Sequence, residues 1–258
     1  MTILEGVGLG TLQGITEFLP VSSKSHLVLA EKLFGIQPPG APAAWEVLLH
    51  AASLVAILIY LRREILSLLT TRRRLVPALL VGTIPAVVLA VLFKPRLETL
   101  LKSPLGIGLG LLLTGTVLWV SERLATDRRP IDSVGVADGF WIGLAQAIAL
   151  APGVSRSGMT VGAGLASGLE RGAAVAFGFL LGAIAIAGAT VLKLREIAAV
   201  PKGDFVPMAL GFGASLGVSL AALWLLTLVV RHKCLFYFTI YCYAVGIAVL
   251  LAKFTGVW

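Results

Sequence analysis

The sequence predicts an all-α integral membrane protein with about six transmembrane helices plus two re-entrant helix–loop–helix hairpins, arranged as an inverted-topology repeat. Three observations predict this fold. First, 58% of the 258 residues are hydrophobic and 13% are charged, with a mean hydropathy of +0.97, whereas charged residues make up about 25% of an average soluble domain. Second, several apolar stretches reach the roughly 20 residues that a helix needs to cross a bilayer. Third, each half of the chain carries one polar run inside apolar sequence, and the two runs resemble each other.

The first hairpin is predicted over residues 3–36. Its apolar sequence is interrupted by the run Gln13-Gly-Ile-Thr-Glu-Phe-Leu-Pro-Val-Ser-Ser-Lys-Ser-His26, and Pro20 marks the break. An ionisable side chain in the hydrocarbon costs at least ~2.5–3.5 kcal/mol. We therefore expect Glu17 and His26 to face a buried polar site rather than lipid.

Three apolar spans follow, then a second hairpin over residues 131–171, then three more spans. The second hairpin is broken at Ala151-Pro152-Gly153 and carries Arg156, another group that lipid would penalise. The six spans are predicted from apolar length at residues 44–61, 76–93, 104–120, 172–192, 206–230 and 235–252.

Basic residues concentrate in three connections between these elements. They are Arg62, Arg63 and Arg72 to Arg74; Arg123, Arg128 and Arg129; and Arg231 with Lys233. Such clusters are typical of cytoplasmic loops. With these loops inside, the first hairpin enters from and returns to the outside, and the second does the same from the inside. Membrane topology therefore explains the net charge of +8, and we expect no nucleic-acid partner.

A shift of 133 residues relates the two polar runs. It aligns Gly10 with Gly143, Gln13 with Gln146, Ile15 with Ile148, Val21 with Val154 and Ser22 with Ser155. Each half is then one hairpin plus three spans, in opposite orientations. We expect a single membrane domain over residues 1–258, with repeat halves of approximately 1–130 and 131–258 and broken helices that face each other near the bilayer midplane.

The second polar run has the features of an anion-binding site. Ser155, Arg156, Ser157 and Thr160 follow a Pro-Gly break. A helix that starts there exposes backbone N–H groups that favour an anion, and arginine adds a planar fork of donors that matches phosphate oxygens. The hydroxyl groups alone could simply cap and pack helices, but that interpretation leaves Arg156 without a counter-ion.

The first polar run supplies reactive groups. Gln13 and Glu17 share a helix face because they are four residues apart, and Ser22, Ser23 and His26 follow the break. A serine hydroxyl needs a neighbouring base to become a good nucleophile, and both Glu17 and His26 are candidates.

Other residues are open to two interpretations. Lys24 either reaches the outer interface or attracts an anionic substrate, and His50 is either a packing hydrogen-bond donor or a pocket residue. Glycines at four-residue spacing predict close helix packing; they include Gly106/Gly110, Gly178/Gly182 and Gly213/Gly217.

Together the two motifs resemble those of the undecaprenyl-diphosphate phosphatase family of bacterial membranes, also called the bacitracin-resistance protein family. The similar segments are Q-G-I-T-E-F-L-P-V-S-S-x-x-H, P-G-x-S-R-S-G-x-T and the stretch from Trp45 to Glu64, and the resemblance covers essentially the whole chain. It implies hydrolysis of undecaprenyl diphosphate to undecaprenyl phosphate plus inorganic phosphate. That reaction recycles the lipid carrier for peptidoglycan and other envelope polymers and is associated with bacitracin resistance.

The resemblance also assigns roles to individual residues. It implies that Ser23, Glu17, His26 and Arg156 are catalytic and that Gln13, Ser22, Ser155, Ser157 and Thr160 bind the diphosphate. Ser23 is the expected nucleophile, with Glu17 or His26 as its base, and a rival version with His26 as the nucleophile stays open. Gln13 stands where many members of the family have Glu, and Lys24-Ser25 replaces the usual small residue and Gly before the histidine.

The resemblance further implies a divalent cation, expected to be Mg²⁺. Glu17 is the best candidate for a protein contact, mainly through substrate phosphates, because Gln13 removes a second carboxylate. The polyprenyl diphosphate lipid and the bilayer are the expected partners, and the sequence leaves a homodimer open. We expect a multi-pass protein of the bacterial inner membrane with its site open to the extracytoplasmic side. The alternative function is a transporter or flippase of an anionic lipid that uses the same pocket.

Overall fold

The structure is a computed structural model that describes residues 1–36, 42–100, 103–197, 202–256 and 258. It does not describe the side chains of residues 42–43, 94–100, 194–197 and 202. The described residues form eleven α-helices and two short 3-10 turns, with no β-strand among them beyond one isolated bridge. The predicted all-α class is confirmed.

The long apolar helices match the predicted spans. They are α3 (Pro42–Tyr60), α5 (Leu75–Leu100), α6 (Pro104–Leu124), α9 (Arg171–Ile197), α10 (Phe205–Arg231) and α11 (Phe236–Phe254). In the described part of the chain, five of them are long and apolar enough to cross a membrane by themselves. A sixth span results if Ala44–Tyr60 is counted with α4 (Arg62–Leu69), although the chain bends by 71° between the two.

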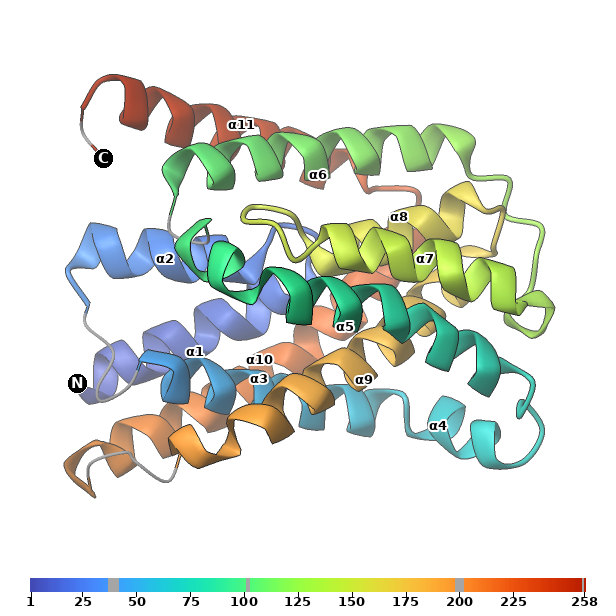
Figure 1. The fold of residues 1–258 in the computed structure, drawn as a ribbon, viewed down its shortest axis with the longest axis horizontal. Helices are drawn as coiled ribbons and strands as arrows, with labels where there is room; N and C mark the ends of the chain where they lie inside the picture. Colours follow the sequence, from blue (N-terminus) through green and yellow to red (C-terminus); the bar gives the residue numbers. More distant parts are fainter. Residues whose placement is uncertain (37–41, 101–102, 198–201, 257) are drawn as a thin grey trace.

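Both predicted hairpins are present as pairs of short helices around a break. The first is α1 (Ile3–Phe18) and α2 (Ser23–Phe34), and the second is α7 (Val136–Ile148) and α8 (Arg156–Ala166). A capping box of Thr2 and Glu5 begins α1, and the side chain of Ser155 caps α8. The hairpins reach into the molecule from opposite ends, so that their breaks meet near its middle (Figure 1).

Glycines on the first helix of each hairpin allow close packing against a long helix. Gly6, Gly10 and Gly14 place α1 directly on the backbone of α10, and Gly139 and Gly143 place α7 on the backbone of α5. A Cβ atom on any of these five residues would overlap a facing backbone carbonyl. Small residues at this spacing let membrane helices approach closely.

Only some of the glycines singled out from the sequence pack closely against other helices or turns. Gly110 lies against Pro152 and Gly153, and Gly178 lies against Thr160. For Gly182, Gly213 and Gly217, no described atom lies within 4 Å of the position that a Cβ atom would take. The prediction for Gly213 and Gly217 is therefore wrong, because both face outward from α10.

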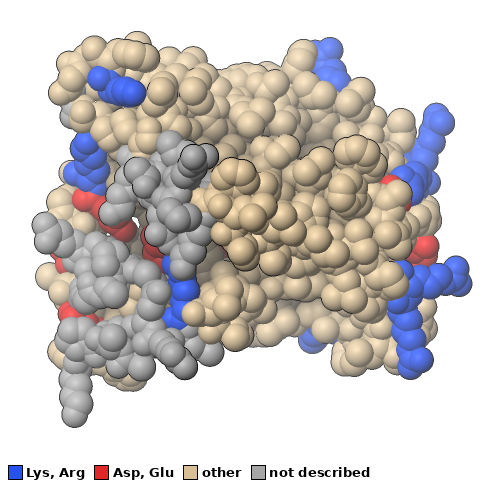
Figure 2. Space-filling view, viewed as in Figure 1, with Lys and Arg blue, Asp and Glu red and all other residues tan. Residues whose placement is uncertain are grey.

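The outer surface of the bundle is apolar. Leu80 is 58% exposed and Leu192 is 86% exposed, whereas the centre holds buried apolar side chains such as Phe18 and Phe179, whose rings meet edge-to-face at 5.5 Å. Most of the middle of the face in Figure 2 carries no charged residue, and Lys and Arg side chains gather at its right-hand end. This distribution is the one expected of helices in lipid.

The three basic connections lie at one end of the molecule, as the topology prediction requires. Arg171 at the start of α9 bonds both Glu122 and the carbonyl oxygen of Val230, and Arg72 bonds Asp132 at 3.0 Å. These contacts join residues from all three connections, and Figure 1 shows the corresponding loops together at the right.

A bidentate ion pair fixes the start of the second hairpin. The Arg129 guanidinium donates to both carboxylate oxygens of Asp138 at 2.9 and 2.8 Å and to the carbonyl oxygen of Ser167 at 3.0 Å. Hydrogen bonds from Arg129 hold the pKa of the Asp138 carboxyl below its usual value. The pair therefore stays ionised at neutral pH and ties α7 to the end of α8.

Replacing Gly10 by Ala should destabilise the protein, because the new methyl group would overlap the backbone of Gly211 and force α1 away from α10. Overpacking of this kind costs about 1–3 kcal/mol. Gly8→Ala is the matched control on the same helix, since no described atom lies within 4 Å of its Cβ position. Thermal unfolding in detergent measures the difference; equal midpoints for both variants would contradict the close α1–α10 packing.

Candidate active site

The breaks of the two hairpins enclose a cavity of about 160 Å³. Residues of α3, α5 and α9 complete its wall, including His50, Ala86 and Ile186. Its polar lining consists of Thr16, Glu17, Ser22, Ser23, Lys24, His50, Gln146, Ser155 and Arg156. The apolar bundle thus holds a small chamber near its middle with ionisable groups from both halves of the chain.

The first break brings Ser23 to the carboxylate of Glu17. Helix α1 ends at Phe18, and Ser22 has a positive φ of 71°, which reverses the chain so that Ser23 begins α2. A positive φ in a non-glycine residue is strained and is typical of functional sites. The Ser23 hydroxyl donates to Oε2 of Glu17 at 2.6 Å.

Glu17 is surrounded by donors. The Gln13 amide donates to Oε2 at 3.0 Å, Arg156 donates to Oε1, and the Nε2 atom of His50 lies 3.7 Å from Oε2. The Glu17 side chain is only 3% exposed. A buried carboxylate requires this kind of compensation, because the desolvation of a charge costs several kcal/mol.

The second break presents Arg156 to the same carboxylate. Gly153 has a φ of +79° and lies on the backbone of Ile107 and Gly110, so a side chain there would be both strained and overlapping. Thr114 of α6 holds the turn by accepting from the backbone N–H of Ser155 at 3.0 Å. Arg156 then begins α8, and its side chain is 27% exposed.

The N-termini of α2 and α8 therefore both start at the cavity, with Ser23 and Arg156 as their first residues. Backbone N–H groups in the first turn of a helix have no acceptor within that helix. Together with the Arg156 guanidinium they favour an anion in the cavity.

Ser157 and Thr160 do not line the cavity but connect its walls. The Ser157 hydroxyl donates to the carbonyl oxygen of Leu19 at 3.2 Å, which joins the two breaks. Thr160 donates to the carbonyl oxygen of Arg156 within its own helix and packs against Gly178 of α9.

His26 also lies outside the cavity lining. Its Nδ1 atom is 2.9 Å from the carbonyl oxygen of Ser22, and its Nε2 atom is 2.7 Å from the hydroxyl of Tyr241 on α11. Because a carbonyl oxygen only accepts, Nδ1 carries the hydrogen, and the neutral ring accepts from Tyr241 at Nε2. Both nitrogens are thus engaged in holding the Ser22 turn.

Four polar residues of the cavity stand outside the set predicted from the sequence, namely Thr16, Lys24, His50 and Gln146. His50 was left open between packing and pocket roles; it lines the cavity while its Nδ1 donates to the carbonyl oxygen of Glu46 at 2.7 Å. Gln146 is 2% exposed, and neither its Oε1 nor its Nε2 has a hydrogen-bond partner among the described residues. The alignment of Gln146 with Gln13 between the two polar runs was the sequence feature that could have identified Gln146 as a site residue. Lys24 also lines the cavity and is exposed, which favours the substrate-side interpretation.

The donors around Glu17 do not fit a magnesium cage built by protein alone. Among the described residues there is no group of three or more His, Cys, Asp or Glu side chains placed to hold an ion. Both oxygens of Glu17 already accept hydrogen bonds, and Arg156 adds positive charge beside them. The site offers at most one carboxylate contact, so any divalent cation would depend on ligands from a bound anion.

Comparisons with known proteins agree with the motif resemblance. The sequence model of one family, described as bacitracin resistance protein BacA, matches residues 6–248. An undecaprenyl-diphosphatase of Moorella thermoacetica is 42% identical over 76% of this chain and 78% of its own length. Proteins of the same name are 35% identical in Desulforapulum autotrophicum, over 99% of this chain and 100% of the relative, and 34% identical in Methanobrevibacter smithii, over 99% of each.

Gln146→Leu should weaken anion binding without lowering the stability of the protein. A buried amide without a partner costs about 1–3 kcal/mol, so the isosteric leucine should leave the unfolding temperature unchanged or raise it. The same change should weaken stabilisation by inorganic pyrophosphate, because a free donor of the cavity is lost. Thermal unfolding with and without pyrophosphate measures both effects.

Gln13→Leu is the matched comparison, since it removes a donor that Glu17 uses and should lower the unfolding temperature without any ligand. A Gln146→Leu variant that is destabilised, yet keeps the full pyrophosphate effect, would show that the amide is structural.

Proposed function

The chain belongs to the family described as bacitracin resistance protein BacA, and we propose that the cavity of Ser23, Glu17 and Arg156 carries out its reaction. The protein is an undecaprenyl-diphosphatase, a hydrolase, and a multi-pass membrane protein. One observation carries the proposal for the site: Glu17 accepts from Ser23 at 2.6 Å and pairs with Arg156 from the other hairpin. A nucleophile, a base and a phosphate-binding cation thus share one carboxylate.

In this proposal the terminal phosphate of the substrate binds between the starts of α2 and α8. The exposed part of the Arg156 guanidinium and the backbone N–H groups of the first turn of α8 donate to its oxygens. Donors fixed in advance in a dry site stabilise the charge that develops during phosphoryl transfer. Lys24 and Gln146, which also line the cavity, add further donors.

The first chemical step transfers the terminal phosphoryl group to Ser23. The Ser23 oxygen forms a bond to the terminal phosphorus, and the bond from that phosphorus to the bridging oxygen breaks. Undecaprenyl phosphate leaves with the bridging oxygen. Glu17 takes the serine proton across the existing hydrogen bond.

The second step hydrolyses the phosphoserine. A water oxygen attacks the phosphorus, the bond to the Ser23 oxygen breaks, and inorganic phosphate leaves. One proton of the water moves to a phosphate oxygen and leaves with the inorganic phosphate, while the proton on Glu17 returns to the Ser23 oxygen. The cavity is then ready for another substrate.

The placement of His26 supports the serine version over a phosphohistidine. Its nitrogens are bonded to Ser22 and Tyr241, and it is not among the residues that line the cavity. In this proposal His26 positions the Ser22 turn, and Glu17 is the base. A divalent cation, expected to be Mg²⁺, would be held by diphosphate oxygens and water, with Glu17 as its protein contact.

We further propose that the fold is an inverted-topology repeat, with halves of approximately 1–130 and 131–258 in a single membrane domain. The offset of 133 residues that relates the polar runs also relates the first residues of α1 and α7, and of α2 and α8. The packing supports a crossed arrangement, since α1 packs on α10 of the other half and α7 packs on α5. With the basic connections in the cytoplasm, the cavity opens to the extracytoplasmic side.

Ser23→Ala should abolish phosphate release from undecaprenyl diphosphate, because no other hydroxyl is hydrogen-bonded to Glu17 among the described residues. The expected loss is at least about 100-fold, the usual range for a catalytic group. Ser53→Ala is the matched control: Ser53 is also buried, and among the described residues its hydroxyl bonds only the carbonyl oxygen of Leu49. The assay uses purified protein in detergent, with chelator and then with added Mg²⁺, which also tests the cation.

Near-normal turnover by Ser23→Ala would overturn the serine mechanism. If wild type released no phosphate under any ionic condition but still bound the lipid through Arg156, the alternative function of lipid transporter or flippase would replace the hydrolase site. Paired broken helices are compatible with that function, but binding alone does not require a serine held on a carboxylate.

Labelling of cysteines tests the side on which the cavity opens. In a Cys234→Ser background, a Lys24→Cys variant should react with a membrane-impermeant thiol reagent added to intact cells, because Lys24 is exposed at the cavity. Arg128→Cys, at the basic end, should react only after permeabilisation. The reverse pattern would place the cavity on the cytoplasmic side.

A further inference from the structure

A second polar cavity lies at the basic end of the molecule. Its volume is about 310 Å³, and it lies where α3 turns into α4, beside the start of α9 and the end of α10. Its charged lining residues are Arg62, Arg63, Glu64 and Arg231. None of its lining residues belongs to the cavity of Ser23, so it is a separate site.

The three arginines of this cavity have no paired carboxylate among the described residues, unlike three other arginines at the same end. Arg72, Arg129 and Arg171 each pair with a carboxylate, of Asp132, Asp138 and Glu122 respectively. For Arg62, Arg63 and Arg231, no described carboxylate lies within ion-pair distance. Arg62 donates to the carbonyl oxygen of Ile59 at 3.1 Å, so its charge remains without a counter-ion.

One of these guanidinium groups lies over the start of a long helix. Gly172 is the second residue of α9 and lines the cavity, and Nη2 of Arg231 is 3.9 Å from the position that a Cβ atom would take on Gly172. The positive end of the helix dipole points to this region. Asp127 already accepts from the backbone N–H of Arg171 at this helix end at 2.8 Å, so an anion in the cavity would be held mainly by the arginines.

The start of helix α4 also supplies hydrogen-bond donors at the cavity. It begins at Arg62, so the backbone N–H groups of Arg62 and Arg63 have no acceptor within the helix. An anion in the cavity would accept hydrogen bonds from these groups and from the guanidinium groups around it.

The position of the cavity indicates a lipid as the source of the anion. After the 71° bend, α4 exposes Leu66 (62%) and Leu69 (67%), as expected of a short helix that lies in the membrane interface. Val175 and Ala176 add an apolar wall, and Tyr60 donates to Thr227 at 3.0 Å at its edge. Aromatic residues favour the headgroup level.

We propose that this cavity binds the phosphate group of an anionic phospholipid from the leaflet at the basic end of the protein. Arg62, Arg63 and Arg231 bind the phosphate oxygens together with the N-terminal N–H groups of α4, and the acyl chains lie on the exposed leucines of α4. Basic pockets between membrane helices are suited to such headgroups. The site does not depend on the catalytic proposal, because the two cavities share no residue.

Native mass spectrometry of the purified full-length protein, titrated with phosphatidylglycerol or with phosphatidylcholine, tests the site. Wild type should bind phosphatidylglycerol in preference to phosphatidylcholine. The double variant Arg62→Gln/Arg231→Gln should bind it at least about tenfold more weakly, because hydrogen bonds to charged groups are lost. Millimolar inorganic phosphate should not displace the lipid.

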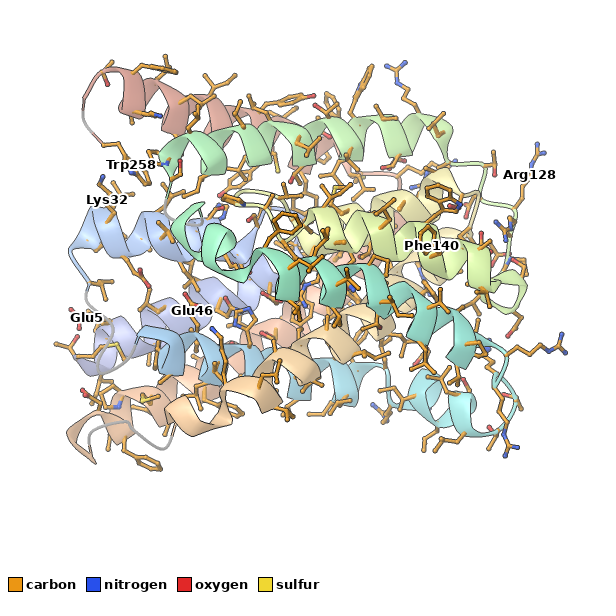
Figure 3. All side chains as sticks on the ribbon, viewed as in Figure 1. Glu5, Lys32, Glu46, Arg128, Phe140 and Trp258 are labelled. Atoms are coloured by element: carbon orange, nitrogen blue, oxygen red, sulfur yellow. The ribbon has the colours of Figure 1, made fainter. Side chains whose placement is uncertain are left out.

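Arg128→Gln is the matched control. Arg128 is an exposed arginine at the same end, points away from the bundle (Figure 3) and does not line the cavity. It should bind phosphatidylglycerol with wild-type affinity. The diphosphatase activity of all variants in detergent should be unchanged, so a failure of this site is distinguishable from a failure of the proposed function.

Two results would overturn the proposal. If Arg128→Gln weakened lipid binding as much as the double variant, the preference would reflect net charge at this end rather than a built site. If inorganic phosphate displaced phosphatidylglycerol at equal affinity, the cavity would be a site for free phosphate and not for a lipid headgroup.

Discussion

The arrangement of the whole molecule depends on one ion pair in its interior, between the buried Glu17 and the partly exposed Arg156. The two residues are 139 apart in the sequence and belong to different hairpins. A carboxylate that is 3% exposed is tolerated only where a cation and hydrogen-bond donors offset its desolvation. That requirement fixes the depth to which each hairpin reaches, and the glycines that bring α1 onto α10 and α7 onto α5 make the approach possible.

The need for free hydrogen-bond donors at the cavity explains why the helices are broken there. A continuous helix would use its own N–H groups and leave none for a ligand, whereas each break starts a new helix at the cavity. The breaks are costly: Ser22 has a φ of 71° and Gly153 has a φ of 79°. Strain of this kind persists only when the surroundings hold it. Tyr241 and His26 hold the first turn, and Thr114 holds the second.

Much of the fold and of the candidate site could be predicted from the sequence. Apolar length predicted the spans, and the two polar runs predicted both breaks and one shared site, because ionisable residues in lipid need a partner. The pairing of Glu17 with Arg156 itself was not predicted. It could not separate His26 from Glu17 as a base, since that depends on which way a side chain turns after a strained residue. Gln146 and His50 were not among the predicted site residues for a similar reason. A single polar residue within an apolar helix does not reveal which neighbour it faces. The glycines of α10 were misjudged because spacing alone does not tell a lipid-facing stripe from a packed one.

On the proposed mechanism, the ion pair also controls when Ser23 is activated. In the empty cavity Arg156 stabilises the negative charge of Glu17, and a carboxylate held in this way is a weak base. The Arg156 side chain is 27% exposed, and among the described residues its second amino group makes only a long hydrogen bond of 3.4 Å, to the carbonyl oxygen of Gly182. Donors therefore remain for a phosphate. A bound diphosphate draws Arg156 toward itself and adds negative charge beside Glu17, and both effects favour transfer of the Ser23 proton to the carboxylate. Activation of the nucleophile then follows from substrate binding, which limits reaction with water when no lipid is present.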